Sequence, residues 1–177
     1  MVTESIHIVP LDGEKPSQFA ERVGRGYADA SVQKDKKHKG QFFTPLAIAQ
    51  FMGNLATPSG KNSVSVLDPG CGLAILSCAL IEHLVEDSKL ETIALMLYET
   101  DKNVVPLTGI VLSYLQEWCK RQGIRLNYQL NESDFVLDKC EYLDSDDSIF
   151  GAMNAGERFD YIISNPPYFK LAKDDVH

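Results

Sequence analysis

Residues 63–74 read Ser-Val-Ser-Val-Leu-Asp-Pro-Gly-Cys-Gly-Leu-Ala, and this stretch decides the fold. Residues 63–67 form a short apolar run that predicts a buried strand, and residues 69–72 supply turn-forming proline and glycine. A helical pattern of apolar residues follows over residues 74–85. A strand that leads through a glycine turn into a helix is typical of parallel α/β units.

The same alternation continues along the chain. Residues 92–98 and 124–130 predict two more strands, with a helix over residues 104–122 between them. After an acidic, irregular connection, residues 159–164 predict a fourth strand. We therefore expect an α/β fold, a Rossmann-like doubly wound layer with a mostly parallel sheet and right-handed crossovers.

Two helices are expected before this layer. Phe19, Val23 and Tyr27 recur every four residues, which predicts an amphipathic helix over residues 16–31, and a basic loop follows over residues 34–40. Thr44 then predicts a hydroxyl N-cap, with Pro45 at the first helical position. The expected apolar face of this second helix consists of Leu46, Ile48, Phe51, Met52 and Leu55. We divide the chain into an N-terminal helical extension with its basic loop, 1–39, and a catalytic-domain part, 40–177.

Composition restricts the class of protein. The 177 residues carry 17 Lys and Arg against 25 Asp and Glu, a net charge of -8, and 44% are hydrophobic, which indicates one globular domain. The apolar runs are too short to cross a bilayer and no secretory signal is visible, so we expect a cytoplasmic protein. The negative charge argues against tight nucleic-acid binding by this segment alone. The scattered cysteines and histidines lack the spacing of a metal site, and we expect reduced, mostly buried thiols.

Ligands of doubly wound sheets bind beyond the carboxyl ends of the strands. The first candidate there is the turn of Asp68, Pro69, Gly70, Cys71 and Gly72, whose glycines let a ligand approach the main chain closely. Such a glycine pair also occurs for packing alone. Ile75 replaces the third glycine of a dinucleotide turn, and no Gly-Lys-Ser/Thr sequence follows that would cradle a triphosphate.

The second candidate follows the next strand. Glu99, with Thr100 and Asp101 after it, places a carboxylate where it can accept hydrogen bonds from both ribose hydroxyls of a nucleoside. The alternative is that Glu99 or Asp101 only caps the following helix. The glycine turn one unit earlier favours nucleoside binding.

The sharpest feature is Asn165-Pro166-Pro167-Tyr168 after the fourth expected strand. The prolines fix the backbone, so the Asn165 side-chain oxygen and the Pro166 carbonyl form a rigid pair of acceptors. Two acceptors beside an aromatic ring suit a planar amine, with Tyr168 stacked on the attached ring. A surface turn is the alternative.

These motifs in this order resemble S-adenosylmethionine-dependent methyltransferases that modify exocyclic amino groups. Residues 40–45, Gly-Gln-Phe-Phe-Thr-Pro, precede the glycine turn and are similar to the first cofactor motif of adenine-N6-specific DNA methyltransferases of restriction-modification systems. The resemblance covers residues 40–168 and implies the methyltransferase form of the doubly wound fold.

The resemblance implies S-adenosylmethionine as cofactor and assigns its contacts. Phe43, Thr44, Pro45 and the helix start would meet the methionine carboxylate, as the positive end of a helix dipole favours an anion. The turn from Asp68 to Gly72 would hold the amino-acid end, and Glu99 with Thr100 the ribose. The resemblance assigns Asp134 and Phe135 to the adenine of the cofactor, although an ordinary acidic loop is the alternative. It places Asn165 beside both the cofactor and the target base.

The reaction that the resemblance implies needs no acidic or basic residue with a shifted pKa. Asn165 and Pro166 would accept the amino hydrogens of adenine, localise the nitrogen lone pair and aim it at the sulfonium methyl. The target base must leave the duplex to reach them, with Tyr168 stacked on it.

The chain ends soon after Tyr168, and nothing after this residue could read a DNA sequence. We expect an N-terminal fragment, truncated after the fourth strand and inactive alone, whose missing C-terminal part binds double-stranded DNA. A restriction nuclease, separate or fused, is a candidate partner. No membrane is expected, and the free edge of the fourth strand would invite self-association.

Three other functions stay open from the sequence. A release-factor glutamine or ribosomal-RNA amino methyltransferase shares the asparagine motif, although residues 43–45 favour DNA. A cofactor-binding module without catalysis would share the nucleoside features. A nicotinamide dehydrogenase is disfavoured by Ile75 and by the asparagine motif.

Overall fold

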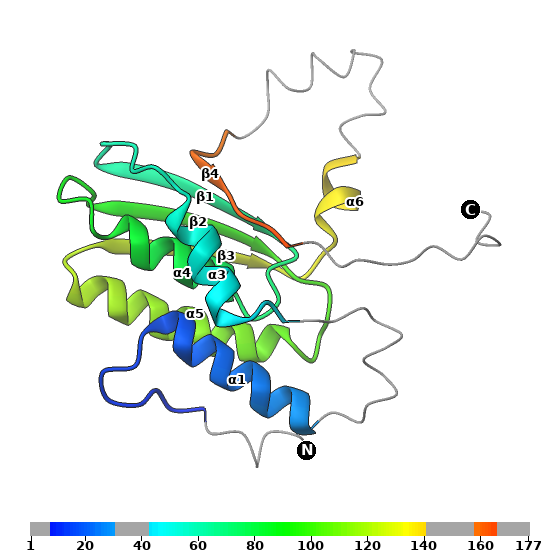
Figure 1. Ribbon diagram of the computed structural model, residues 1–177. Coiled ribbons are helices and arrows are strands. Elements are labelled where there is room, and N and C mark those ends of the chain that lie inside the picture. Colours follow the sequence, from blue (N-terminus) through cyan, green and yellow to red (C-terminus); the bar gives the residue numbers. More distant parts are fainter. Residues whose placement is uncertain (1–7, 31–42, 141–157, 166–177) are drawn as a thin grey trace.

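A computed structural model describes residues 8–30, 43–140 and 158–165 of the chain (Figure 1). The basic loop at residues 34–40 and the residues Pro166, Pro167 and Tyr168 lie outside these described residues. In chain order the elements are α1 (Pro16–Ala30), α3 (Leu46–Asn54), β1 (Ser63–Pro69), α4 (Ile75–Leu84), β2 (Thr92–Tyr98), α5 (Val105–Arg121), β3 (Arg125–Asn131), α6 (Phe135–Cys140) and β4 (Tyr161–Ile162).

The strands form one parallel sheet in the order β3-β2-β1-β4. This arrangement confirms the predicted α/β class. From β1 the chain builds outward through β2 to β3 and then returns to add β4 on the other side of β1. The reversal places the topological switch point between β1 and β4, where ligands of such sheets bind. The segments that lead into and out of the switch point therefore decide the site.

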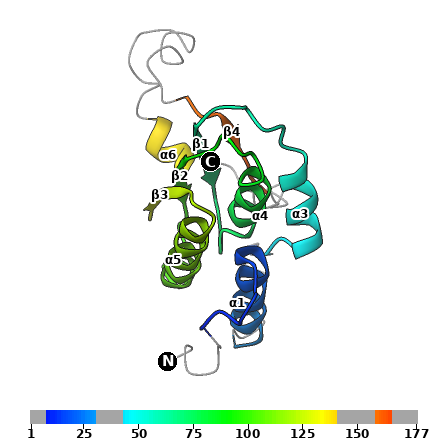
Figure 2. The ribbon, with the colours of Figure 1, turned by 90° about the vertical axis from the view of Figure 1, so that its left-hand side faces the viewer.

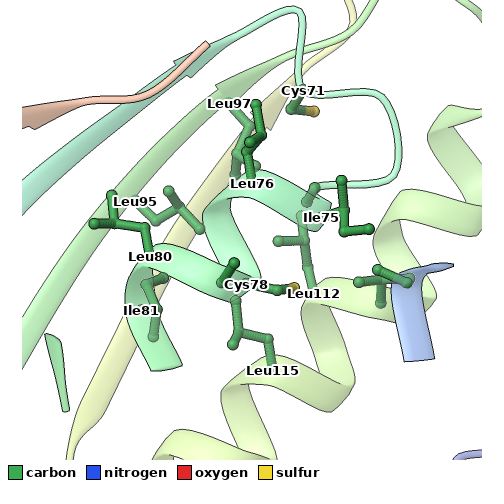
Figure 3. Packing of buried hydrophobic residues seen from close by; sticks show 14 of the residues in the cluster. Cys71, Ile75, Leu76, Cys78, Leu80, Ile81, Leu95, Leu97, Leu112 and Leu115 are labelled. Carbon is green, nitrogen blue, oxygen red and sulfur yellow. The ribbon is translucent and has the colours of Figure 1, made fainter. Parts of the chain in front are cut away.

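Four helices, α1, α3, α4 and α5, lie on one side of the sheet (Figure 2). Alternate strand side chains, such as Val66, Ile93 and Leu95, point into a core shared with α4 and α5. Figure 3 shows α4 between the strand leucines and Leu112 and Leu115 of α5. Burial of this apolar area supplies the main stabilisation of the layer.

Helix α1 belongs to the same core. Phe19 and Val23 are fully buried, and the Phe19 ring meets Tyr114 of α5 edge to face at 5.2 Å. The buried Glu82 of α4 accepts hydrogen bonds from the Ser17 amide at 2.6 Å and the Ser17 hydroxyl at 2.8 Å. This carboxylate caps the N-terminus of α1 from another helix, where the helix dipole favours negative charge.

Helix α3 confirms the predicted second helix but corrects its face. Ile48, Phe51 and Leu55 are 49%, 62% and 66% exposed, so they are not on the buried side; Leu46 and Met52 pack partly against the core. The buried residues are Ala49 and Gly53. A Cβ at Gly53 would lie 2.8 Å from the Ala79 carbonyl of α4, so the small residues let the two helices approach closely.

Two further expectations, both for the second half of the chain, are wrong. The predicted strand over residues 159–164 is paired only over Tyr161–Ile162, although Asp160 and Ile163 extend the hydrogen bonding to β1. The connection expected to be irregular begins with the short helix α6, because the Asp134 side chain accepts from the Val136 and Leu137 amides at its start.

The other strands and helices lie within two residues of their predicted bounds, and β2 matches its predicted range. Cys71, Cys78 and Cys119 are free and buried, as expected. Burial raises the pKa of each of these thiols, which keeps them protonated. Across the described ranges, the longest apolar helices fall short of what a bilayer crossing requires.

Candidate active site at the carboxyl ends of the strands

The turn after β1 folds over the end of β2. The amides of Gly70 and Cys71 both donate to the Tyr98 carbonyl, at 2.9 and 2.8 Å. Gly70 and Gly72 have φ angles of 77° and 54°, which only glycine adopts without cost. No heavy atom of the described residues lies within 4 Å of the place where a Gly70 Cβ would stand, so this side of the turn is open. The main chain at Gly70 is thus left uncovered by other side chains of the described residues.

Glu99 holds this turn in place from the end of β2. One carboxylate oxygen accepts from the Gly72 amide at 2.9 Å and the other from the Asp101 amide at 2.7 Å. Asp101 in turn accepts from the Asn103 amide at the start of α5. The N-cap of α5 is Val104, without a side-chain capping bond, so neither Glu99 nor Asp101 caps this helix; Asp101 holds the turn before α5, and Glu99 braces the glycine turn. Each Glu99 oxygen can still accept a second hydrogen bond, because a carboxylate has about four acceptor positions.

Asp68 is the last residue but one of β1, beneath the same turn, and it is fully buried. Its Oδ2 accepts from the Ser77 hydroxyl at 2.5 Å, while Oδ1 has no hydrogen-bond partner among the described residues. Burial, with a further contribution from the negative charge of Glu99, raises the pKa of Asp68 to about 7, although the Ser77 hydrogen bond opposes the shift. A buried carboxylate oxygen without a donor is rare and costly, and a ligand N–H group would satisfy it.

The asparagine after β4 lies beside the first motif. The Ser164 hydroxyl donates to the Pro69 carbonyl at 3.0 Å, and the Asn165 side-chain amide donates to the Thr44 hydroxyl at 3.0 Å. Thr44 is only 8% exposed. These two bonds bring the segments around residues 44, 69 and 165 together across the switch point, although they are far apart in the sequence.

Thr44 does not cap α3, contrary to the sequence prediction. The N-cap is Pro45, which makes no side-chain capping bond, and the Leu46 amide donates to Glu21 of α1 at 3.1 Å. The Thr44 hydroxyl is engaged by Asn165 instead. Phe43 packs against Tyr27 with ring centroids 5.9 Å apart, and it also borders Gly72.

Asp134 and Phe135 lie beyond β3, next to the end of β2. The Phe135 ring meets Tyr98 at 5.1 Å with an interplanar angle of 72°. One Asp134 side-chain oxygen is occupied by the first amides of α6, so this residue has a structural role in the free chain. Thr100 is exposed beside Glu99.

Three residues that hold the candidate site in place were not predicted from the sequence. Ser77 fixes Asp68, Ser164 fixes the strand that delivers Asn165, and the Thr108 hydroxyl donates to the Gly72 carbonyl at 2.6 Å. Serine and threonine are too common for their positions to stand out. Among the described residues, no cluster of three His, Cys, Asp or Glu side chains could hold a metal ion.

Asp160 sets the register that brings Asn165 to the site. Its carboxylate accepts from the Ser65 amide at 2.7 Å, from the Ser65 hydroxyl at 2.9 Å and from Lys61 at 2.5 Å. The Lys61 hydrogen bond, followed by those from Ser65, lowers the pKa of Asp160 to about 2. This exposed clamp joins the beginning of β4 to β1.

The sequence matches the family model of the N-6 DNA methylases over residues 27–176. The chain belongs to this family. Membership confirms the resemblance to the adenine-N6 DNA methyltransferases that was drawn from the motifs.

Two curated relatives are a type II methyltransferase and the methylase subunit of a type I restriction enzyme. The chain is 30% identical over 144 residues to the type II methyltransferase M.BsuBI of Bacillus subtilis, a match that covers 81% of the chain and 27% of the relative. It is 30% identical over 145 residues to the methylase subunit of the type I restriction enzyme EcoEI of Escherichia coli, covering 77% and 25%. The chain thus spans about a quarter of the length of these relatives.

Two solved structures share the fold of this chain. One, from Listeria monocytogenes, is described as a class I S-adenosylmethionine-dependent methyltransferase; it has a TM-score of 0.56 at 16% identity, over 94% of this chain and 44% of that one. The other, from Vibrio vulnificus, is described as a modification subunit of a type I restriction enzyme, with a TM-score of 0.53 at 23% identity, over 89% and 29%. At these identities the likeness concerns the fold.

Proposed function

We propose that this protein, as part of a whole enzyme, transfers a methyl group from S-adenosylmethionine to the exocyclic amino nitrogen of adenine in DNA. The observation that carries the proposal is Oδ1 of the fully buried Asp68, which has no partner among the described residues and lies beneath an open glycine turn. A ligand with a cationic amino group would satisfy this oxygen and stabilise the ionised carboxylate.

The other polar groups fit the same cofactor. Thr44 would donate its hydroxyl proton to the methionine carboxylate, near Phe43 and Pro45. The main chain from Pro69 to Gly72, Cys71 included, would lie along the amino-acid end. Glu99 would accept from the ribose hydroxyls through its remaining acceptor positions, with Thr100 beside it.

Asp134 and Phe135 would complete the cofactor site at its adenine end. The aromatic pair that Phe135 forms with Tyr98 offers an apolar wall for a purine ring. One Asp134 oxygen caps α6, and its carboxylate would accept from the purine amino group through its other acceptor positions.

Methyl transfer depends on how the chain presents the target amine. S-adenosylmethionine would supply an electrophilic methyl group: as the N–C bond forms, the C–S bond breaks, S-adenosylhomocysteine leaves as a neutral thioether, and the methylated nitrogen releases one proton to solvent. The Asn165 side-chain oxygen and the Pro166 carbonyl would accept the two amino hydrogens, so that the nitrogen lone pair points in line with the transfer. Pro167 would hold the bend rigid, and Tyr168 would stack on the flipped base.

DNA would be bound mainly by the rest of the whole protein. We base this on the net charge of -8 of the chain and on its coverage of about a quarter of its restriction-system relatives. In this proposal residues 1–39 are the helical extension, and residues 40–177 the cofactor-binding half of the catalytic domain. A restriction nuclease is the expected partner, and the cytoplasm, where the DNA substrate resides, the expected location.

Transfer of a tritiated methyl group to unmethylated duplex DNA tests the proposal. The whole protein should produce N6-methyladenine, identified by mass spectrometry of the nucleosides, and Asn165→Ala should lower the rate by about 10²–10³-fold while the cofactor affinity stays within about threefold. Label in glutamine-bearing release factor or in ribosomal RNA, but not in DNA, would support the alternative substrates. Unchanged transfer by Asn165→Ala would contradict the assigned mechanism, and loss of affinity without loss of rate would support a cofactor-binding module.

A further inference from the structure

The hydrogen bond from the Asn165 side chain to Thr44 determines which end of the amide faces the target. An asparagine side chain carries a donor NH₂ group and an acceptor oxygen at opposite ends of one planar group. Since Nδ2 donates to the Thr44 hydroxyl at 3.0 Å, Oδ1 points away from Thr44. The orientation that serves an incoming amine is the one with Oδ1 free to accept, and Nδ2 in that place would repel the amine.

A threonine hydroxyl has one proton, and this limits the arrangements at Thr44. If Thr44 donated to the Asn165 oxygen, the amide would be turned with its NH₂ group outward. If Thr44 donates elsewhere, it can only accept from Asn165, and Oδ1 must face outward. At 8% exposure, Thr44 has little access to bulk water, so its proton needs a defined acceptor.

We infer that Thr44 is a positioning residue that couples the cofactor site to the catalytic amide: a carboxylate that accepts the Thr44 proton commits the Asn165 amide to the orientation that receives the target amine. The inference rests on the proposed function, because it takes the acceptor to be the carboxylate of the cofactor. The Thr44 hydroxyl would thus both bind the cofactor and orient the Asn165 amide.

The surroundings hold Thr44 rigidly enough for this role. The adjacent Phe43 is packed against Tyr27, and the Leu46 amide is tied to Glu21 of α1. On the other side, Ser164 is tied to the Pro69 carbonyl at 3.0 Å. The backbone on both sides is therefore held in place. If the Thr44 hydroxyl donates its proton to a different acceptor, we expect the Asn165 amide to respond and the backbone to stay where it is.

Nuclear magnetic resonance of the 177-residue chain tests the inference without a methylation assay. The side-chain NH₂ signals of Asn165 are assigned by their loss in Asn165→Ala, and their exchange with solvent is measured with saturating S-adenosylhomocysteine, which carries the carboxylate. A second ligand, 5′-methylthioadenosine, keeps the nucleoside and the thioether but lacks the amino-acid end, carboxylate included. We expect S-adenosylhomocysteine to slow the exchange by about fivefold or more, because its carboxylate would hold in one orientation the hydrogen bond from Nδ2 to Thr44 that the structure shows, and 5′-methylthioadenosine to leave it unchanged.

Two variants of Thr44 complete the test. Thr44→Val, close in shape but without the hydroxyl, should lose the slowing although calorimetry shows bound S-adenosylhomocysteine, and Thr44→Ser should restore it. Equal slowing by both ligands in the wild-type chain, or equal slowing in Thr44→Val, would overturn the inference alone. Failure of the wild-type chain to bind S-adenosylhomocysteine at all would instead refute the proposed function, and the inference with it.

Discussion

Replacing Asp68 by Asn should stabilise the free chain at pH 8, and its effect on the free energy of unfolding should become more favourable as the pH rises from 5 to 8. The pKa of Asp68 rises from 3.8 to about 7 on folding, chiefly because the group is buried. The unfolded chain therefore releases this proton at lower pH than the folded chain, so stability falls as the pH rises from about 4 to about 7 and is constant above. A shift of about three units corresponds to a penalty of about 4 kcal/mol for the ionised side chain.

Asparagine has nearly the shape of aspartate and carries no charge, so it escapes this penalty. Its NH₂ group would stand where Oδ1 is now unpartnered, which costs about 1–3 kcal/mol at every pH. A comparison between two pH values removes this constant cost. About two units separate pH 5 from the pKa of Asp68, so the stability gained by Asp68→Asn should be about 2–3 kcal/mol larger at pH 8 than at pH 5.

Urea unfolding of both proteins at pH 5 and pH 8 measures this difference. Asp160→Asn is the matched control, because the pKa of Asp160 is lowered to about 2 and its titration is complete below pH 5. Its effect on the free energy of unfolding should be the same at both pH values. If Asp68→Asn changed stability equally at pH 5 and pH 8, the assignment of a buried, strained carboxylate to the site would be refuted.

Two other predictions concern the binding of the cofactor and the packing of α3 on α4. The affinity for S-adenosylmethionine should rise with pH up to about 7, because Asp68 ionises, and fall above about pH 8, because the amino group of the cofactor loses its proton. Calorimetry across this range should show no such rise for Asp68→Asn. A rise that persists in this variant would contradict the assigned contact. Gly53→Ala should lower the free energy of unfolding by about 1–3 kcal/mol, since its Cβ would stand 2.8 Å from the Ala79 backbone. Gly109→Ala, with no atom within 4 Å of its Cβ among the described residues, should raise it by up to about 1 kcal/mol; equal effects in urea unfolding would contradict the packing of α3 on α4.

The sheet could be predicted because its strands are buried and continuous in sequence. The run of β2 is apolar over Thr92–Tyr98, and its bounds match the prediction. Strand β4 was overestimated, because an apolar run shows which residues are buried and not which of them have a paired neighbour. The α3 face was wrong because close packing on α4 selects the small residues Ala49 and Gly53 and turns larger apolar side chains outward.

The candidate site was predictable where its motifs combine rare residues. Two glycines in a turn and an asparagine before two prolines are unusual enough to be recognised without a structure. Their mutual contacts were not predictable, since the bond from Asn165 to Thr44 joins residues 121 positions apart. Common residues such as Ser77 have no sequence signal, and their role depends on which carboxylate lies within reach.

Calorimetric titration of the 177-residue chain with S-adenosylmethionine tests the central claim most directly, with Asp68→Asn and Glu99→Ala measured beside the wild type. We predict one bound cofactor for the wild-type chain, with affinity reduced about 10- to 100-fold in each variant, as the loss of charged hydrogen-bond acceptors costs about 1.5–3 kcal/mol. A wild-type chain that takes up no cofactor, or variants that bind it as tightly as the wild type, would contradict the claim that these carboxylates form a cofactor site.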